Sequence, residues 1–165
     1  MSATISIVRA AAEHAPIVAP LLDAYRQFYR QPSDVIAAEA FVRERLQRRE
    51  SVIFLAVAGT PIADETEGLV LPPAVGFVQL YPMFTSVGLR RTWILNDLYV
   101  DAVHRRSGAA TLLMTAAEDH AKSMGAASLA LLTEHTNTPA QALYERRGWK
   151  QDLDYRRYTL KFPAT

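Results

Sequence analysis

Cysteine is absent from this 165-residue chain, which excludes disulfides, thiolate nucleophiles and thiolate metal ligands. A long apolar run is missing as well, because no stretch approaches the roughly 20 residues that a membrane-spanning helix needs. His14, His104 and His120 show no spacing typical of metal ligands. We therefore expect a soluble, cytoplasmic protein with no metal and no membrane partner.

An excess of one charge is also lacking. Lysine and arginine number 18 and aspartate and glutamate 17, for a formal net charge of +1. The basic residues are scattered and form no stripe of the kind that nucleic-acid-binding domains carry, so we expect no nucleic-acid partner. Half of the residues are apolar. This length and composition predict one compact domain over residues 1–165, with a substantial core.

The apolar pattern predicts the order of the elements. Strands are expected over residues 4–9, 52–58, 74–81, 92–100, 129–132 and 155–162, with one more short strand around Trp149. Helices are expected over 13–29, from a cap at Ser33 or Asp34 to about residue 49, over 108–124, and from Thr138 as N-cap to Gly148 as the stop. Residues 60–73 read as a mobile hairpin loop and 82–91 as a polar loop. Mostly antiparallel strands followed by one parallel β-α-β crossover predict an α/β (α+β) fold.

Residues 100–110 join an apolar strand to an apolar-faced helix through a short basic loop that ends in small residues. A helix start carries backbone N–H groups without intrahelical partners and the positive end of the helix dipole. Small residues there let a diphosphate approach the backbone, and Arg105 and Arg106 add charge. The loop is thus either a pyrophosphate cradle or an ordinary strand-to-helix turn with two solvated arginines.

A second signal follows the strand at 129–132. In a parallel pair, both following helices start at the carboxyl edge of the sheet, where ligands of open α/β sheets bind. Asn137 is therefore expected beside the cradle, as a cofactor hydrogen-bonding group or as a cap-like loop residue. Tyr144 lies one helical turn beyond Ala140. Its alternative role is to pack its ring on the core with the hydroxyl at the surface.

These two segments resemble motifs of the GNAT superfamily of N-acetyltransferases. The R-x-x-G-x-A pattern of residues 105–110 is similar to its acyl-CoA pyrophosphate signature, and the N-x-x-A-x-x-L-Y-E-x-x-G-W pattern of 137–149 to its second motif. Residues 93–100 are similar to the central strand that receives the pantetheine arm. The resemblance covers about residues 93–149, and the chain looks similar to bacterial members of the polyamine and protein acetyltransferase branch.

The resemblance implies the GNAT fold, a mixed central sheet of about six or seven strands flanked by about four helices. It implies direct acetyl transfer from acetyl-CoA to a primary amine of a small molecule or protein, without a covalent enzyme intermediate. Tyr144 would protonate the leaving thiolate, since a phenol keeps its proton at neutral pH. Strand backbone would bind pantetheine and stabilise the oxyanion. The implied cofactor-binding residues are Leu98, Tyr99, Val100, Arg105, Arg106, Ser107, Gly108, Ala109, Ala110, Asn137, Ala140 and Tyr144.

The general base stays open. Some relatives carry a glutamate at the position that matches Asn96, and asparagine cannot take a proton. Asp97, Glu134 and His135 are alternatives, acting directly or through water. Asp97 also fits a structural role facing a buried N–H, and the other two fit a solvated loop.

The acceptor site is expected to be walled by aromatic residues. The candidates are Tyr25, Phe28, Tyr29, Tyr81, Phe84 and Trp93, of which Tyr25, Phe28 and Trp93 also fit the core. Residues 81–84 are the stronger candidate, being large and apolar in an expected loop. Acids at Asp23, Asp64, Glu65 and Glu67 would attract a cationic acceptor or form a wet surface.

Two functions follow from this pattern. The first is an acetyl-CoA-dependent N-acetyltransferase, favoured by Tyr144. The second is a non-catalytic acyl-CoA-binding sensor or interaction module of GNAT fold, favoured by the missing central-strand glutamate. Relatives are often dimers, and apolar residues of the expected last strand are compatible with either a homodimer contact or the core.

Overall fold

The computed structural model describes residues 4–66 and 68–163 and divides at residue 132 into two compact units. The first unit runs to Leu132 and the second begins at Thr133. None of the helices in the described residues is long and apolar enough to cross a membrane. The expectation of one domain over 1–165 stays a prediction.

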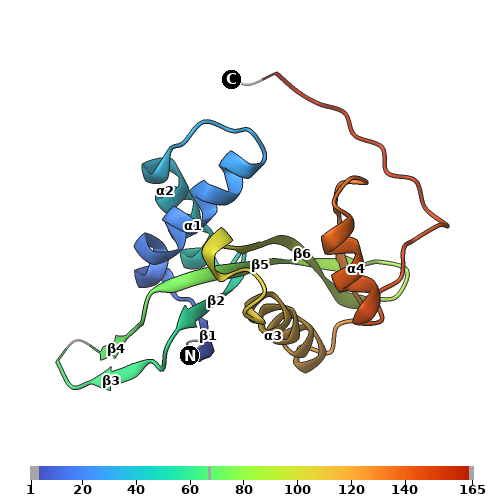
Figure 1. Ribbon diagram of the computed structural model, residues 1–165. Coiled ribbons are helices and arrows are strands. Elements are labelled where there is room, and N and C mark those ends of the chain that lie inside the picture. The colour runs from blue at the N-terminus through green and yellow to red at the C-terminus, as the bar shows by residue number, and fades with distance from the viewer. Residues whose placement is uncertain (1–3, 67, 164–165) are drawn as a thin grey trace. The chain divides into compact units, whose positions relative to one another are not determined.

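A five-stranded mixed sheet forms the first unit (Figure 1). Its strand order is β1 (Ile5–Arg9), β2 (Val52–Ala58), β5 (Ala74–Thr85), β6 (Arg90–Val100) and β7 (Leu129–Leu131). The first four pair antiparallel, and β7 joins β6 in parallel after the crossover through α3 (Ala109–Ser123). The predicted α/β (α+β) class, with its single parallel crossover, is confirmed.

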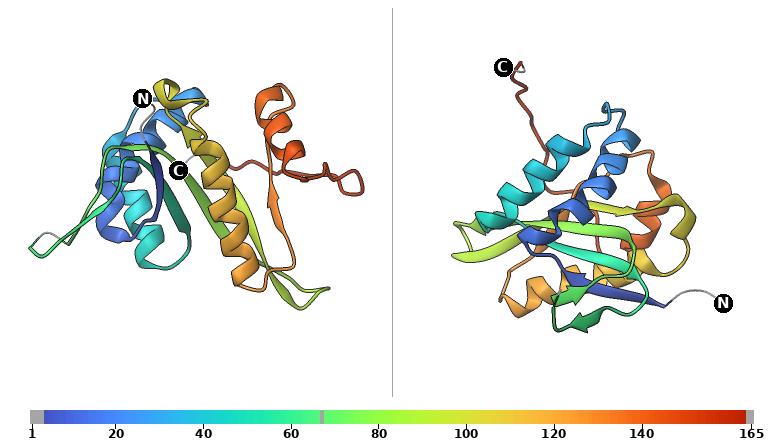
Figure 2. Two further views of the ribbon diagram at one scale, coloured as in Figure 1. Left: turned by 60° about the horizontal axis from the view of Figure 1, so that its bottom comes forward. Right: turned by 90° about the vertical axis from the view of Figure 1, so that its left-hand side faces the viewer.

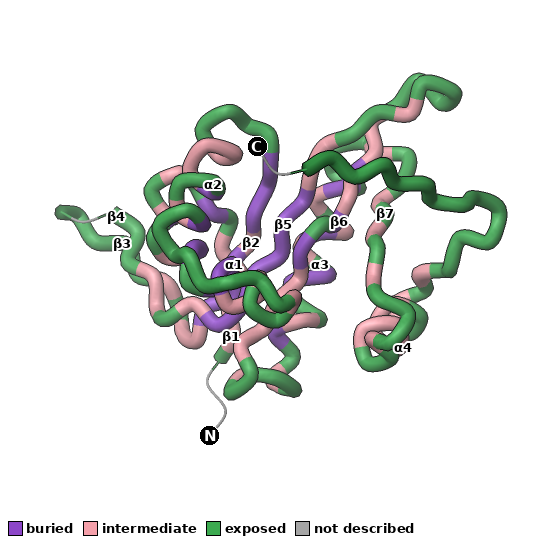
Figure 3. Tube along the Cα trace, turned by 90° about the horizontal axis from the view of Figure 1, so that it is seen from above, coloured by how far each residue is buried: buried purple, intermediate pink, exposed green. Residues whose placement is uncertain are grey.

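Helices cover both faces of this sheet (Figure 2). The hairpin of α1 (Ala15–Phe28) and α2 (Val35–Gln47) lies over one face, and α3 lies over the other. A short 3-10 turn, Ala12–His14, leads into α1, and a second one, Ala102–His104, precedes α3. Buried residues concentrate in the strands β2, β5 and β6 and in the helix faces toward them (Figure 3), as the apolar periodicity predicts.

The β5–β6 hairpin is longer than the sequence predicts. Residues expected to form a polar loop continue both strands, with Pro82 paired to Trp93 and Thr85 to Arg90. Pairing between β2 and β5 ends at Val52 and Leu80, and beyond that point no strand of the described ranges pairs with this edge of β5. Proline is tolerated on such an edge because its missing N–H breaks no ladder bond.

The structure differs from the prediction in two further places, the segment 60–73 and strand β7. The expected hairpin loop contains a small separate sheet of β3 (Ile62–Asp64) and β4 (Gly68–Val70). The expectation that β7 is buried on both faces is wrong: its residues are half-buried or exposed, because β7 is the last strand of the sheet order. A continuous apolar run cannot by itself distinguish an edge strand from a central one.

The second unit contains α4 (Thr138–Arg146). Asn137, and not Thr138, is its N-cap, with the Asn137 side chain accepting from the Ala140 N–H at 3.4 Å. The strands expected around Trp149 and over 155–162 are absent from the described residues, where 151–163 are exposed and without ladder pairs. An alternating pattern becomes a strand only where a neighbouring strand takes up its backbone hydrogen bonds.

Candidate active site

The central feature of the site is a bulge in β6. Gln79 of β5 pairs with Asp97, while the next residue, Leu80, pairs with Leu95, so Asn96 is an extra residue on β6. Such a bulge re-aims the side chains that follow and increases the local twist. The parallel pairing of β6 with β7 also ends at Leu95, although β6 continues to Val100. The two strands therefore part at the bulge.

The parted strand exposes a line of backbone groups. The Asp101 N–H donates to the Val75 carbonyl of β5 at 2.9 Å. Because alternate residues of an antiparallel strand direct their backbone groups to the same side, Leu98 and Val100 direct theirs away from β5. From the described residues, these outward groups receive one long contact, from Arg105 Nε to the Val100 carbonyl at 3.4 Å. An extended ligand chain can add to this edge as a strand.

The loop between β6 and α3 forms a concave backbone surface. Asp101 shapes its start by accepting from the Val103 N–H at 2.7 Å and approaching the His104 ring at 3.2 Å. Positive φ values follow at Arg106 (67°) and at Gly108 (88°), the N-cap of α3. Successive N–H groups in such a conformation turn toward a common point and bind anions.

This loop leaves its donors available. Within the described part of the chain, no hydrogen bond is recorded for the backbone N–H groups of Arg106, Gly108 and Ala110. A Cβ built on Gly108 would meet nothing within 4 Å, so the backbone there faces open space. Arg105 and Arg106 are exposed, and Ala109 is buried against the sheet. The predicted cradle residues 105–110 therefore have the geometry of an anion site.

The remaining predicted site residues lie in the second unit. Asn137 caps α4 with its side-chain oxygen, and Ala140 supplies the N–H that the cap binds. Tyr144 is half-buried in α4, with its ring centroid 6.1 Å from that of Trp149. The joint action of these three residues with the cradle stays a prediction.

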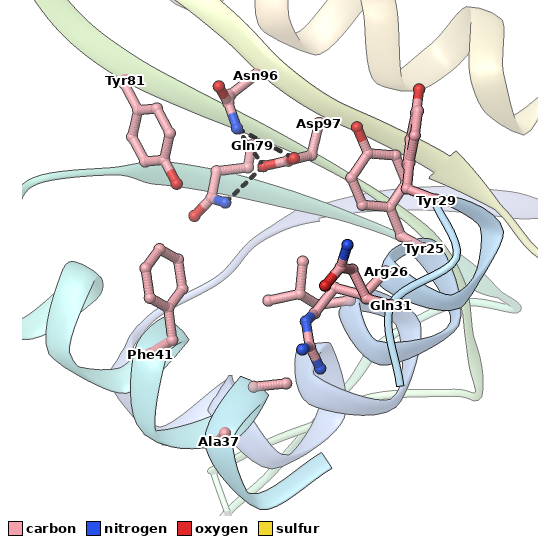
Figure 4. A pocket seen from close by; sticks show the side chains of 12 residues that line it. Tyr25, Arg26, Tyr29, Gln31, Ala37, Phe41, Gln79, Tyr81, Asn96 and Asp97 are labelled. Atoms are coloured by element: carbon pink, nitrogen blue, oxygen red, sulfur yellow. Dashed lines mark hydrogen bonds between the residues drawn. The ribbon is translucent and has the colours of Figure 1, made fainter. Parts of the chain in front are cut away.

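A pocket of about 480 Å³ opens between the α1–α2 hairpin and the strands β5 and β6 (Figure 4). Its walls are mostly aromatic and apolar, and its polar groups come chiefly from the bulge region. The lining residues are Leu22, Tyr25, Arg26, Tyr29, Gln31, Ala37, Ala38, Phe41, Gln79, Tyr81, Asn96 and Asp97. A mostly apolar cavity with a few polar groups is the usual form of a small-molecule site.

Asp97 is the buried acid of this pocket. Gln79 Nε2 donates to its Oδ2 at 2.7 Å, and Asn96 Nδ2 approaches both carboxylate oxygens at 3.1 Å. Burial raises the pKa of Asp97 above its ordinary value, while the bond from Gln79 acts in the opposite direction. The result is a carboxylate that takes up a proton more readily than a surface aspartate does.

Two tyrosines beside Asp97 keep their protons. Burial raises the pKa of Tyr25 far above its ordinary value, and the negative charge of Asp97 adds to the rise. Burial, followed by the charge of Asp97, also raises the pKa of Tyr81 to about 12. Both phenols are therefore neutral hydrogen-bonding groups at physiological pH.

The α1–α2 wall is held by a second buried acid, Asp23. Its carboxylate accepts from Ser33 Oγ and the Asp34 N–H, both at 2.7 Å, and from Gln27 Nε2 at 2.9 Å. The bond from Ser33 is the largest cause that lowers the pKa of Asp23. Asp23 was a candidate for attracting a cationic acceptor, but these bonds tie α1 to the start of α2 and occupy its oxygens.

The structure sorts the other acceptor candidates. Tyr25, Tyr29 and Tyr81 line the pocket, whereas Trp93 is buried in contact with the His120 ring, 4.8 Å between centroids. Phe28 and Phe84 are exposed and do not line the pocket. Phe84 lies on strand β5 and not in a loop, and the Arg91 Cζ lies 5.0 Å from the centroid of its ring. Asp64 and Glu65 are exposed at the β3–β4 turn, and Glu67 lies outside the described residues.

Gln79, Arg26 and Phe41 are pocket residues that the sequence pattern did not assign to a site. Gln79 carries a usable signal, since it is the one polar residue in the buried run 75–80 of β5. The candidate bases Glu134 and His135 are exposed in the second unit. Nowhere in the described ranges do three or more His, Cys, Asp or Glu side chains gather in a way that could hold a metal ion.

Comparison with known proteins gives consistent matches. Residues 19–149 match the acetyltransferase (GNAT) family. The uncharacterized N-acetyltransferase YhfO of Bacillus subtilis (strain 168) is 43% identical over 159 residues, covering 96% of this chain and 99% of the relative. A crystal structure of a probable acetyltransferase is 36% identical with a TM-score of 0.82, covering 97% of this chain and 99% of the other. A ribosomal-protein-alanine N-acetyltransferase from Brucella melitensis biovar Abortus 2308 shares the fold, at 24% identity and a TM-score of 0.71, over 96% and 100% of the two chains.

Proposed function

This chain belongs to the acetyltransferase (GNAT) family, and from that premise we propose that it transfers an acetyl group from acetyl-CoA to a primary amine of a small molecule or protein. The family, the GNAT fold and the acyltransferase class predicted from the two motifs are confirmed by these matches. One observation carries the rest of the proposal. Within the described residues, the edge of β6 beyond Leu95 pairs with no strand, and this edge runs from the pocket acid, Asp97, to the loop before α3.

The donor occupies that edge in our proposal. The pantetheine arm adds to the backbone of Leu98 and Val100 as an extra strand, and the pyrophosphate lies in the cradle of residues 105–110. Arg105 or Arg106 contacts the phosphates, and Asn137 and Ala140 complete the cofactor site. Tyr99 places its ring beside Tyr25, with centroids 6.3 Å apart, and its backbone pairs with Phe77 of β5, so it serves the donor site by holding Leu98 and Val100 in the strand.

The acceptor amine occupies the pocket. The bound ammonium first releases one proton to water, because only the neutral amine has a lone pair. Asp97, directly or through one water, then takes the second proton, which the nitrogen loses as it attacks the thioester carbonyl. A backbone N–H of Leu98 or Val100 stabilises the oxyanion of the tetrahedral intermediate. When this intermediate collapses, the carbon–sulfur bond breaks and Tyr144 gives its proton to the departing thiolate. Asp97 is preferred over Glu134 and His135 because it is buried in the pocket and precedes Leu98 in the chain.

A non-catalytic acyl-CoA-binding module is the second candidate. Its supporting observation is that Asn96 replaces the glutamate of some relatives and that Gln79 and Asn96 already bond to Asp97. A carboxylate held in this way also serves as a structural acceptor. Both candidates predict binding of acetyl-CoA, and they differ in turnover.

The test combines binding and turnover. Calorimetric titration with acetyl-CoA should give saturable binding, and release of free CoA thiol is then followed with polyamines, amino acids, aminoglycosides, lysine peptides and arylalkylamines. Amine-dependent CoA release together with an N-acetylated product supports the enzyme. Binding without amine-dependent release across the panel supports the binding module, and absence of binding contradicts both.

A further inference from the structure

The acceptor pocket offers a cationic ligand a single carboxylate. Among the described residues that line it, Asp97 is the one acid and Arg26 the one cation. Arg26 is itself paired with Asp23, at 3.3 Å between Nη1 and Oδ1. A ligand with several ammonium groups would bring charges into this space that no further carboxylate balances, which is strongly unfavourable in a partly desolvated site.

The walls of the pocket favour an apolar, flat ligand body. Figure 4 shows Phe41 of α2 facing the β5–β6 side, with Tyr81 above it and the ring of Tyr25 on the α1 side. Tyr25 and Tyr29 pack edge to face, with centroids 5.0 Å apart, and so present a rigid wall. Aromatic faces bind apolar groups and also attract a single ammonium. A volume of about 480 Å³ suits one small molecule.

Gln79, Asn96 and Asp97 form one polar end of the pocket on the strand side, whereas Arg26 and Gln31 lie apart from them on the side of the α1–α2 hairpin (Figure 4). Gln79 is 1% exposed, and its Nε2 is committed to Asp97. Its Oε1 has no hydrogen-bond partner among the described residues, and Figure 4 shows this oxygen turned away from Asp97, on the side of Tyr81. A buried acceptor without a donor is unfavourable, and an N–H of a ligand would satisfy it. The hydroxyl of Tyr81 points to the same region and so borders this end.

Building on the proposed function, we infer that the acceptor is a small primary amine with a single positive charge on an aromatic or similarly flat apolar body. Its nitrogen lies at the Gln79–Asp97 end, donating to Gln79 Oε1, and its body lies between Phe41, Tyr81 and Tyr25. Polycationic amines such as polyamines and aminoglycosides are then poor acceptors, because only one of their charges finds a carboxylate.

Steady-state rates with matched amines test this inference. 2-Phenylethylamine is compared with putrescine, with spermidine and with phenylalanine, which adds a carboxylate to the same body. We expect kcat/KM for 2-phenylethylamine to exceed that of each of the other three at least tenfold. Equal or higher kcat/KM for putrescine or spermidine overturns the single-charge inference, and a preference for phenylalanine assigns Arg26 to a ligand carboxylate instead.

A pair of variants tests the aromatic wall. Phe41→Ala should lower kcat/KM for 2-phenylethylamine at least tenfold, should affect ethylamine much less, and should leave the Kd of acetyl-CoA unchanged. Phe84→Ala removes an exposed aromatic side chain outside the pocket and should change none of these values. An equal effect of Phe41→Ala on both amines overturns the placement of the ligand body.

A direct binding measurement separates this inference from the proposed function. Titration of the CoA-loaded protein with 2-phenylethylamine and with spermidine requires no turnover. Tighter binding of 2-phenylethylamine supports the inference even for a protein that proves not to be a catalyst. Tighter binding of spermidine overturns the inference even where acetyl transfer is demonstrated.

Discussion

The two sides of the bulge in β6 present different kinds of chemical group. On one side, Asp97 and Gln79 form a buried cluster of side chains whose hydrogen bonds are mostly satisfied within the protein. On the other, the loop before α3 presents the backbone N–H groups of Arg106, Gly108 and Ala110, which have no partner within the described residues. In our proposal, the first arrangement holds the proton acceptor in place and the second binds the phosphates of the donor.

The two sides of the bulge should therefore respond differently to amino-acid substitution. A backbone cradle depends on chain conformation and on the absence of bulky atoms, so the identity of most side chains matters little there. A side-chain cluster depends on each polar group, because loss of one partner leaves another buried and unpaired. Substitutions on the Asp97 side should therefore change rate and pH dependence, and those at the cradle should change affinity for the donor.

The largest expected effect is that of Asp97→Asn, which should lower kcat/KM by about 10²- to 10⁴-fold, because asparagine cannot accept the amine proton. The Kd of acetyl-CoA should not change. Since only the ionised carboxylate accepts a proton and burial raises the pKa of Asp97, kcat/KM of the unsubstituted protein should rise with pH through a step above the ordinary aspartate value of about 4.

That step should be missing from the pH profile of Asp97→Asn. The matched control is Asp119→Asn, which neutralises an exposed acid of α3 and should leave rate and profile unchanged. A rate for Asp97→Asn within threefold of the original would show that Asp97 is a structural acid only.

Tyr144→Phe is expected to have the next largest effect. It removes one hydroxyl, and kcat should fall by about 10²-fold, the lower end of what a general acid contributes, because a thiolate departs readily without full protonation. The Kd of acetyl-CoA should change little. Tyr158→Phe, at an exposed position of the same unit, is the control. An unchanged kcat for Tyr144→Phe would mean that another group or water supplies the proton.

Gly108→Ala tests the cradle. An added Cβ would stand where the backbone now faces open space, and the Kd of acetyl-CoA should rise about tenfold, or about 1.4 kcal/mol. Because residue 108 has a positive φ, which alanine adopts at a cost, the variant should also have a free energy of unfolding about 1 kcal/mol lower.

Gly125→Ala is the control for this loss of stability. Gly125 follows the other end of α3, has a φ of 65° and likewise has nothing within 4 Å of an added Cβ. The Gly125→Ala variant should lose about as much stability as Gly108→Ala, as measured by thermal unfolding. Its affinity for acetyl-CoA, measured by calorimetric titration, should stay unchanged. Equal affinities for the two variants would place the phosphates elsewhere.

The smallest expected effect is a displacement of the pH profile in Gln79→Leu. The bond from Gln79 lowers the pKa of Asp97 against the effect of burial, so its loss should raise that pKa further. The acidic step of kcat/KM should then move to higher pH. Gln27→Leu removes the corresponding amide bond to Asp23 and should not move the step. A step that stays in place or moves to lower pH contradicts the assignment of the step to Asp97.

The local sequence pattern is sufficient to predict helix ends and caps, because neighbouring residues determine them. The α3 helix begins after Gly108 and is followed by Gly125, both at positive φ as the predicted helix limits require. Asp34 caps α2 by accepting from the Ala37 N–H at 2.9 Å. These features depend on a few neighbouring residues, so the sequence pattern predicts them correctly.

Features that depend on distant partners were predicted less well. The hairpin extension through Pro82 exists because residues 82–85 pair with 90–93 across a short turn. The edge position of β7 and the absence of a strand over 155–162 likewise reflect which chain segment lies alongside, which no local pattern contains.

By itself, the sequence predicted the family, the helices and the five strands of the main sheet, and it predicts a phosphate cradle, because such a cradle consists of small residues and backbone conformation within eleven consecutive positions, 100–110. Only the tertiary structure decided the pocket that we propose for the acceptor. It set Gln79 against Asp97, which are 18 residues apart, through the register of β5 and β6 and the extra residue Asn96 at the bulge. A shift of one residue would turn these side chains to the other face of the sheet, so the pocket depends on strand pairing as well as on composition.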